Sequence, residues 1–269
     1  MRHSPVVPGR GPVPLAGGTA PGRVPLVAVA HGSRDPRAAA TVAALLDRVR
    51  LARPGLPVVT AFLDHCVPSL PQALRGLDAG RGASAMSCVV LPLLLTEAYH
   101  SRVDLPAALN EARARDPWLR PCQGATLGPH PLLLRALERR LAEAGVPAGD
   151  PDTAVVLVSA GSSDAGANAV VAATARQWAR TGWWAVTAAY ASAAGPTPEQ
   201  AVERLRRAGA PRVAVAPYLL APGHFADKVR AATPGAVHAD VLGAAPELVD
   251  VLLERYDAAR LTAWTGTGT

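Results

Sequence analysis

Three polar residues, His31, Asp64 and His100, follow three predicted strands in the first half of the chain. His31 and Asp64 come directly after short apolar runs, and His100 follows the end of a third run by five residues, so in a parallel sheet all three are expected at the carboxyl edge, where side chains from different strands meet. Two imidazoles and a carboxylate can bind a divalent metal ion or accept protons near neutral pH. Their spacing matches no known ligand signature, so spacing alone leaves a structural role open for each histidine.

Short apolar runs alternate with longer stretches of helical period, which predicts an α/β chain with mainly parallel sheets. In the first half, the expected strands cover 24–30, 57–63 and 85–95, and the expected helices cover 37–51, 69–77, 102–115 and 131–144. The Gly- and Pro-rich stretch 145–152 is typical of a linker.

After this linker the same motifs return in the same order, which indicates an internal repeat. The segments 26–35, 61–64, 90–95 and 127–131 recur as 155–164, 189–192, 215–220 and 242–246. Four matched blocks predict two similar α/β lobes, each a mainly parallel sheet flanked by helices. We expect the lobes to face each other over a cleft that holds the active site.

The second half of the chain keeps only one of the three polar residues named above. Ala160 takes the place of His31, and Ser192 takes that of Asp64. The third position keeps its histidine, His224, which either lines the cleft or is simply retained. We infer one working site in the first lobe, with the second lobe as a cover or partner wall.

Three motifs carry a family resemblance: Val-Ala-His-Gly-Ser-Arg-Asp at 29–35, Ala-Phe-Leu-Asp at 61–64 with Pro68 behind it, and Pro-Leu-Leu-Leu-Thr at 92–96, followed by His100 and Val-Asp-Leu-Pro at 103–106. With these motifs the chain resembles the sirohydrochlorin chelatases, class II chelatases that insert a divalent metal into a reduced tetrapyrrole without a nucleotide. The similarity is strong over 24–144 and weaker over 153–256, as in the two-lobe long form of that family.

The resemblance implies that His31 and His100 are the catalytic histidines and that both hold the metal together with Asp64. The family commonly has Glu at the position of Asp64, whose side chain is one methylene shorter. Such residues suit the reaction because the ring loses two pyrrolic protons as the metal enters, and imidazoles can accept them. Three protein ligands also leave coordination positions open for the ring nitrogens.

Four further residues are expected to bind the substrate: Ser33, Arg34, Arg102 and His224. The two arginines lie beside the catalytic histidines, and a guanidinium pairs well with the carboxylates on the ring periphery. A solvated surface charge is the alternative for each arginine, and a turn or helix cap is the alternative for Ser33. We expect His65 to take no part, because side-chain alternation along an extended segment turns it away from Asp64.

The expected reaction uses no ATP and no permanently bound cofactor, because no phosphate-binding motif follows Gly32 and Ser33. A divalent metal is then a substrate, Fe²⁺ or Co²⁺ and in principle Ni²⁺, together with sirohydrochlorin, in sirohaem or cobalamin biosynthesis. A non-catalytic tetrapyrrole- or metal-binding carrier is the alternative. A periplasmic two-lobe solute receptor is a third class, which would need an export signal that is not visible.

Composition excludes several other classes. The chain has 269 residues, of which 49% are hydrophobic and 18% charged, so it is not disordered. Its longest apolar stretch, 88–95, is far shorter than the about 20 residues that span a bilayer. The net charge of +6 is half due to arginines in residues 1–24, without a basic run, so we expect no nucleic-acid partner.

Three cysteines without a Cys-x-x-Cys pattern indicate neither a disulfide framework nor a structural zinc site, and they favour the reducing cytoplasm. We expect a monomer with two pseudo-dimeric lobes. Its parts are a disordered N-terminal extension over 1–23, the catalytic lobe over 24–144, a degenerate second lobe over 153–256 and a C-terminal tail over 257–269.

Overall fold

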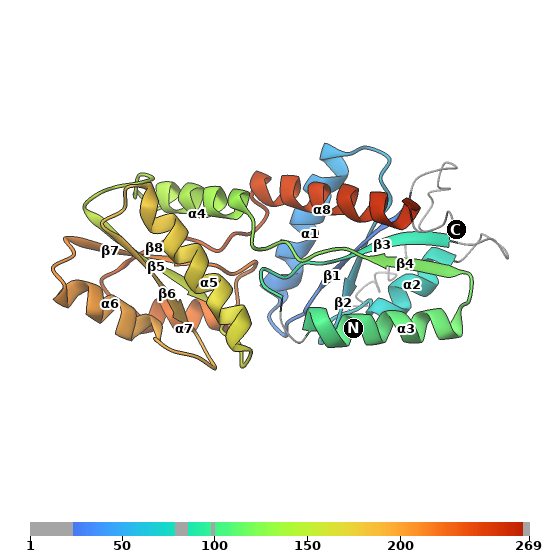
Figure 1. The fold of residues 1–269 in the computed structure, drawn as a ribbon, viewed down its shortest axis with the longest axis horizontal. Helices are drawn as coiled ribbons and strands as arrows, with labels where there is room; N and C mark the ends of the chain where they lie inside the picture. The colour runs from blue at the N-terminus through green and yellow to red at the C-terminus, as the bar shows by residue number, and fades with distance from the viewer. Residues whose placement is uncertain (1–23, 79–85, 98–99, 266–269) are drawn as a thin grey trace, which may run out of the picture.

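The structure, a computed structural model, describes residues 24–78, 86–97 and 100–265, and contains two four-stranded sheets (Figure 1). The first has the order β2-β1-β3-β4, formed by Leu26–Ala30 (β1), Val58–Phe62 (β2), Met86–Pro92 (β3) and Leu119–Gln123 (β4). The second has the order β6-β5-β7-β8, formed by Thr153–Ser159 (β5), Ala185–Tyr190 (β6), Arg212–Pro217 (β7) and Val237–His238 (β8). All neighbouring strands are parallel, which confirms the predicted fold class.

The sheets are flanked by the helices Pro36–Ala52 (α1), Leu70–Asp78 (α2), Leu105–Arg115 (α3), Pro131–Glu143 (α4), Ala165–Trp178 (α5), Pro198–Arg207 (α6), His224–Ala232 (α7) and Pro246–Thr265 (α8). A π-helical turn, His100–Asp104, precedes α3, and a short 3₁₀ turn, Ala179–Thr181, follows α5. Helices α1 and α5 begin in the same way: the carboxylates of Asp35 and Asp164 accept hydrogen bonds from the N–H groups of Arg37 and Gly166.

The central strand β1 shows why the apolar runs are continuous. Leu26 and Ala28 face one core, and Val27 and Val29 face a second core on the other side of the sheet. A parallel strand covered on both faces buries every side chain, so its sequence does not alternate between apolar and polar residues.

Helix α4 packs on the sheet of the other half of the chain (Figure 1). Its buried residues Leu133, Leu137 and Leu141 share one hydrophobic core with Val155 and Leu157 of β5. The helix is amphipathic and lies on the same face of the second sheet as α5, where the indole N–H of Trp178 donates to Glu138 of α4 over 2.9 Å. The first sequence half therefore supplies part of one layer of the second lobe.

Helix α8, from the second half of the chain, packs in turn on the first sheet, where it covers β3 and β4 (Figure 1). Tyr256 and Ala259 are buried there, and the hydroxyl of Tyr256 donates to the carbonyl of Val24 over 2.6 Å. Arg53, directly after α1, forms an ion pair of 2.6 Å with Asp257. The helix thus continues to Thr265 through residues that the sequence predicted to be a tail, because its last turns complete the first lobe. The expected extension over 1–23 lies outside the described residues.

One strand of the first sheet, β4, was not among the predicted elements. Its sequence Leu-Arg-Pro-Cys-Gln contains a proline and a charged residue. Proline cannot donate a ladder hydrogen bond, and β4 tolerates it because it lies at the edge of the sheet.

The three cysteines are free and differ in burial. Burial of Cys88 in β3 raises the pKa of its thiol to about 12, and burial also raises the pKa of Cys122. Because the thiolate is the nucleophile, we expect a thiol reagent at pH 8 to label Cys66 first and Cys88 only after unfolding. Mass spectrometry of the labelled native chain, with the guanidinium-unfolded chain as control, measures this order. Full labelling of Cys88 in the native state would contradict the packing of β3.

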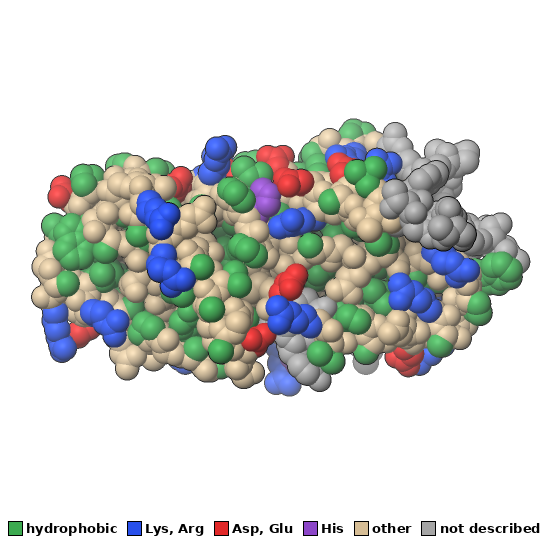
Figure 2. Space-filling model, viewed as in Figure 1, with side chains coloured by type: hydrophobic (Ala, Val, Ile, Leu, Met, Phe, Trp, Pro, Cys, Tyr) green, Lys and Arg blue, Asp and Glu red, His purple; other side chains and the backbone are tan. Residues whose placement is uncertain are grey.

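Arginine and lysine side chains are scattered among acidic and apolar ones on the face shown in Figure 2, without a continuous basic area. Across the described ranges, the helices are too short or too polar to cross a bilayer.

Candidate active site

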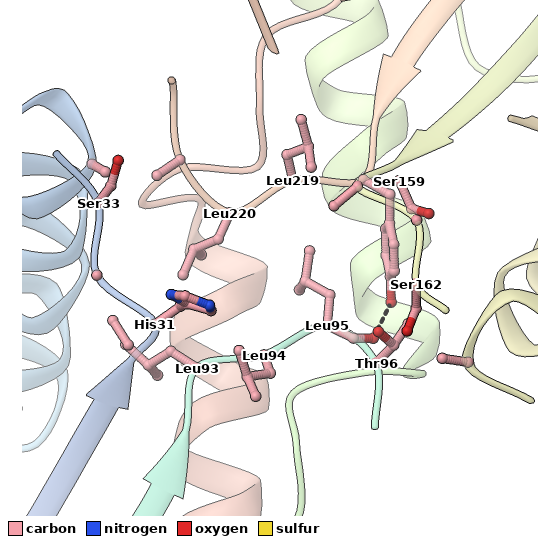
Figure 3. Close-up of a pocket in the computed structure, with 18 of the residues that line it drawn as sticks. His31, Ser33, Leu93, Leu94, Leu95, Thr96, Ser159, Ser162, Leu219 and Leu220 are labelled. Carbon is pink, nitrogen blue, oxygen red and sulfur yellow. Dashed lines mark hydrogen bonds between the residues drawn. The ribbon is translucent and has the colours of Figure 1, made fainter. Parts of the chain in front are cut away.

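A pocket of about 520 Å³ lies between the two lobes. The carboxyl ends of β1 and β3 form one wall, and those of β5 and β7 form the other (Figure 3). Helices α1 and α5 contribute small and aliphatic side chains such as Ala39, Val42 and Val171. The pocket is therefore mainly apolar, with polar groups at the strand ends, as is typical of small-molecule sites.

His31 projects into this space from the first residue after β1 (Figure 3). Gly32, which follows it, has φ +93°, and a Cβ at this position would lie 1.8 Å from the carbonyl oxygen of Asp64. Only glycine permits this turn at such close approach. The N–H of Asp64 donates to the carbonyl of His31 over 2.9 Å, so the β1 and β2 loops are joined directly behind the imidazole.

The second lobe repeats this loop pair without the imidazole and the carboxylate, since Ala160 and Ser192 take their places. Gly161 has φ +86°, and a Cβ there would lie 1.9 Å from the carbonyl oxygen of Ser192. The N–H of Ser192 donates to the carbonyl of Ala160 over 2.9 Å. The backbone thus keeps the turn while the side chains differ, so the fold does not require the imidazole of His31 or the carboxylate of Asp64.

Asp64 is exposed beside the pocket and is joined to His65, contrary to the expected geometry. His65 has φ +60°, so the segment is not extended and side-chain alternation does not apply. The ring Nε2 of His65 lies 3.2 Å from the Oδ2 of Asp64, and the backbone N–H of His65 donates to the Oδ1 of Asp64 over 2.7 Å. The expectation that His65 points away from Asp64 was therefore wrong. Its counterpart Ala193 has φ +58°, so the turn belongs to the fold rather than to the histidine.

The backbone of His100 opens the π-helical turn before α3, but its side chain lies outside the described part of the structure. The segment from β3 toward this turn lines the pocket with Leu93, Leu94, Leu95 and Thr96 (Figure 3). Convergence of His31 and His100 therefore stays a prediction.

Among the expected substrate contacts, Ser33 lines the pocket and Arg34 is exposed outside its lining. The Oγ of Ser33 accepts a hydrogen bond from the N–H of Asp35 over 3.1 Å, as the turn interpretation predicts. His224 is exposed at the start of α7, with its ring 5.7 Å from that of Phe225, and lies outside the pocket lining.

Arg102 reaches across the boundary between the lobes. Its guanidinium lies 3.5 Å from the carboxylate of Asp164 in the second lobe and 3.5 Å from that of Glu97. Arg37 of α1 pairs with Asp227 of α7 over 2.5 Å, and the hydrogen bonds from Arg37 hold the pKa of Asp35 below its usual value. These ion pairs connect the two lobes.

The described side chains contain no group of three or more His, Cys, Asp and Glu positioned to hold a metal ion. The role of Asp64 as a ligand therefore remains a prediction. Its carboxylate is paired with His65 and lies outside the residues that line the pocket.

Sequence reasoning missed the polar residues of the second wall: Ser159, Ser162, Asn168 and Tyr218. The signal was present in the repeat, which aligns the end of β5 with that of β1 and places Tyr218 at the position of Leu93. The Tyr218 hydroxyl crosses to the first lobe and donates to the carbonyl of Leu95 over 3.2 Å. Burial raises the pKa of this tyrosine, so it stays a neutral donor.

The family model of CbiX matches residues 25–144 and, a second time, residues 154–259. The chain belongs to the CbiX family. The double match agrees with the repeat in the sequence and with the two sheets. It also confirms the resemblance that the three motifs indicated.

Curated relatives of this CbiX chain are named as sirohydrochlorin chelatases. The sirohydrochlorin cobaltochelatase of Priestia megaterium is 32% identical over 204 residues, covering 72% of this chain and 63% of that protein. The sirohydrochlorin ferrochelatase of Bacillus subtilis (strain 168) is 27% identical over 236 residues, covering 84% and 88%. The chain thus spans slightly less than two thirds of the length of the cobaltochelatase.

Solved structures share the fold of this CbiX chain. SirB from Bacillus subtilis with Fe³⁺ has a TM-score of 0.71 at 24% identity, covering 92% of this chain and 98% of that one. CbiX, described as the terminal enzyme for biosynthesis of siroheme in denitrifying bacteria, has a TM-score of 0.60 at 21% identity, covering 87% and 99%.

Proposed function

We propose that this CbiX-family chain inserts a divalent metal ion into sirohydrochlorin. The observation that carries the proposal is the pocket between the lobes, largely apolar and with His31 at the end of β1, where the family motif predicts the catalytic imidazole. A tetrapyrrole presents two broad apolar faces and a polar centre. A cleft with aliphatic walls and one imidazole on the first wall fits that distribution of polarity.

The reaction exchanges two protons for one metal ion. As the metal forms bonds to the ring nitrogens, the two pyrrole N–H bonds break, and the protons leave for a base or for water. His31 would accept a proton or hold the incoming ion for a short time, with His100 and Asp64 in the roles that the resemblance implies. This exchange of protons for a metal ion includes no phosphoryl transfer, so the proposed reaction uses no ATP.

The proposal also includes the contacts with the ring periphery, the identity of the metal, the oligomeric state and the cell compartment. Arg34 and Arg102 would pair with carboxylates on the ring periphery, and for Arg102 the substrate would replace Asp164 as partner. Fe²⁺ and Co²⁺ are the proposed metals, because the names of the curated relatives contain both ferrochelatase and cobaltochelatase. Both walls come from one chain, which supports a monomer, and three free cysteines support the cytoplasm.

The insertion rate should fall as the pH drops from 8 to 5 and should not change when ATP is added. A protonated imidazole neither binds a metal nor accepts a pyrrole proton, so activity is present above the range in which imidazoles titrate and is lost below it. The loss of free-base sirohydrochlorin absorbance with Co²⁺ or Fe²⁺ measures the rate, and single-turnover conditions keep product release from masking the chemistry.

Dependence of the rate on ATP would contradict the proposal. A single-turnover rate that is flat between pH 5 and 8 would remove the role of the histidines. Binding of sirohydrochlorin without conversion would instead support the carrier alternative.

A further inference from the structure

A hydroxyl on the second wall opens onto the pocket and has no hydrogen-bond partner among the described residues. Ser159, the last residue of β5, lines the pocket and is 6% exposed. Within the described ranges, its Oγ makes no hydrogen bond, although its carbonyl accepts from the N–H of Ala191 over 2.9 Å. The Oγ is accessible from the pocket although the rest of the residue is enclosed, so a molecule in the pocket can supply its hydrogen-bond partner.

Three other polar side chains on the same wall already form hydrogen bonds within the protein. The Oγ of Ser162 accepts from the N–H of Asp164 over 3.1 Å. The amide of Asn168 bonds to both the N–H and the carbonyl of Ser162, over 3.0 Å and 2.7 Å. The hydroxyl of Tyr218 donates to Leu95, as described above. Ser159 and Ser163 therefore carry the hydroxyls of this wall that remain available to a ligand, and of the two only Ser159 is enclosed, since Ser163 is exposed.

The first lobe shows that the fold does not need this hydroxyl. The repeat aligns Ser159 with Ala30, the last residue of β1. The two residues occupy the same register, since Ala30 pairs with Phe62 and Ser159 pairs with Tyr190. An alanine forms the same strand end in the first lobe, so the serine adds a hydroxyl that the strand itself does not use.

We propose that Ser159 accepts a hydrogen bond from a pyrrole N–H of the free-base ring, on the face opposite to His31. Figure 3 shows the two residues on opposite sides of the pocket, at the ends of β1 and β5. This inference rests on the proposed function, because it takes the pocket to hold a tetrapyrrole.

A neutral donor fits this position better than a carboxylate of the ring periphery. Aliphatic residues such as Val171 and Leu219 surround the pocket here, and a carboxylate with one hydroxyl donor would bury a charge almost without compensation.

This contact distinguishes the substrate from the product. The free-base ring carries N–H groups, whereas metal insertion removes both of these protons. After insertion the Ser159 hydroxyl loses its donor, so the metallated ring is held less tightly than the free base and can leave. Ser159 is thus a binding residue that favours the ring before the metal has entered.

The test compares Ser159→Ala with Ser192→Ala, a matched substitution in the same lobe. The Oγ of Ser192 donates to the carbonyl of Ala160 over 2.9 Å, and Ser192 does not line the pocket. Equilibrium dialysis gives the Kd for sirohydrochlorin and for its cobalt complex, and thermal unfolding gives the Tm of each variant without ligand.

For Ser159→Ala we expect a Kd for free-base sirohydrochlorin raised by about five- to tenfold, an unchanged Kd for the cobalt complex, and a Tm equal to or about 2 °C above that of the wild type. For Ser192→Ala we expect a lower Tm and unchanged Kd values. A purely structural serine would instead lower the Tm and leave the ratio of the two Kd values unaltered.

Three results would overturn the inference while leaving the proposed function intact: an unchanged Kd of Ser159→Ala for the free base, an equal loss of affinity for both rings, or a Tm that falls as in Ser192→Ala. Failure of the wild type to bind sirohydrochlorin would overturn the proposed function itself, and the inference with it.

Discussion

Replacing His31 by alanine should lower the kcat/KM of metal insertion by about 100-fold or more, which is the range found when a general base is removed. The imidazole lines the pocket between the lobes and can take up a pyrrole proton or hold the metal there. Because His31 is exposed at a strand end and Ala160 forms the same turn in the second lobe, the free energy of unfolding should change by about 1 kcal/mol or less.

His238→Ala is the matched control for this substitution. His238 lies in β8, bonded through Nε2 to Thr233, and is not among the residues that line the pocket between the lobes. Its kcat/KM should stay within about twofold of the wild type, since remote surface and edge substitutions act mainly on stability. Equal loss of activity in both variants would show that the effect of His31→Ala is not specific to the site.

Replacing Gly32 by alanine should lower the free energy of unfolding by about 3 kcal/mol or more, the largest stability effect that we expect from a single added methyl group. The new Cβ would lie 1.8 Å from the carbonyl oxygen of Asp64, in a backbone conformation with φ +93°. Either the β1 loop or the β2 loop must move, and the hydrogen bond between Asp64 and His31 would break. The midpoint of urea unfolding measures the loss.

Gly76→Ala supplies a control of the opposite sign. Gly76 lies in α2 with an exposed Cα and nothing within 4 Å of an added Cβ. Alanine in a helix interior is better than glycine by about 0.5–1 kcal/mol, so this variant should be slightly more stable than the wild type. If Gly32→Ala unfolded at the same urea concentration as Gly76→Ala, the close approach of the two loops would be disproved.

Much of the fold could be predicted because the signals are local and occur twice. The apolar run at 26–30 and its copy at 155–159 are strands, and each is followed by a Gly turn and an Asp that caps the next helix. The exchange of α4 and α8 could not be predicted, because an amphipathic helix shows which of its faces is buried but not which sheet that face covers. The short edge strand β4 was hidden by its proline.

The site was only partly predictable for a similar reason. His31 follows a strand and has an alanine as counterpart, which marks it as dispensable for the fold. The ion pair of Arg102 with Asp164 depends on how the lobes meet, and no spacing in the sequence encodes that. The left-handed turn at His65 likewise comes from the joined loops rather than from its own residue type, since Ala193 adopts it too.

The most direct measurement is a single turnover of free-base sirohydrochlorin with excess protein and Co²⁺ at pH 8, without nucleotide, in parallel for the wild type, His31→Ala and a sample without protein. We expect the wild type to convert the ring far faster than the sample without protein, and His31→Ala to lose most of that acceleration. A wild-type rate equal to the spontaneous rate, or a His31→Ala rate equal to that of the wild type, would contradict insertion at this site.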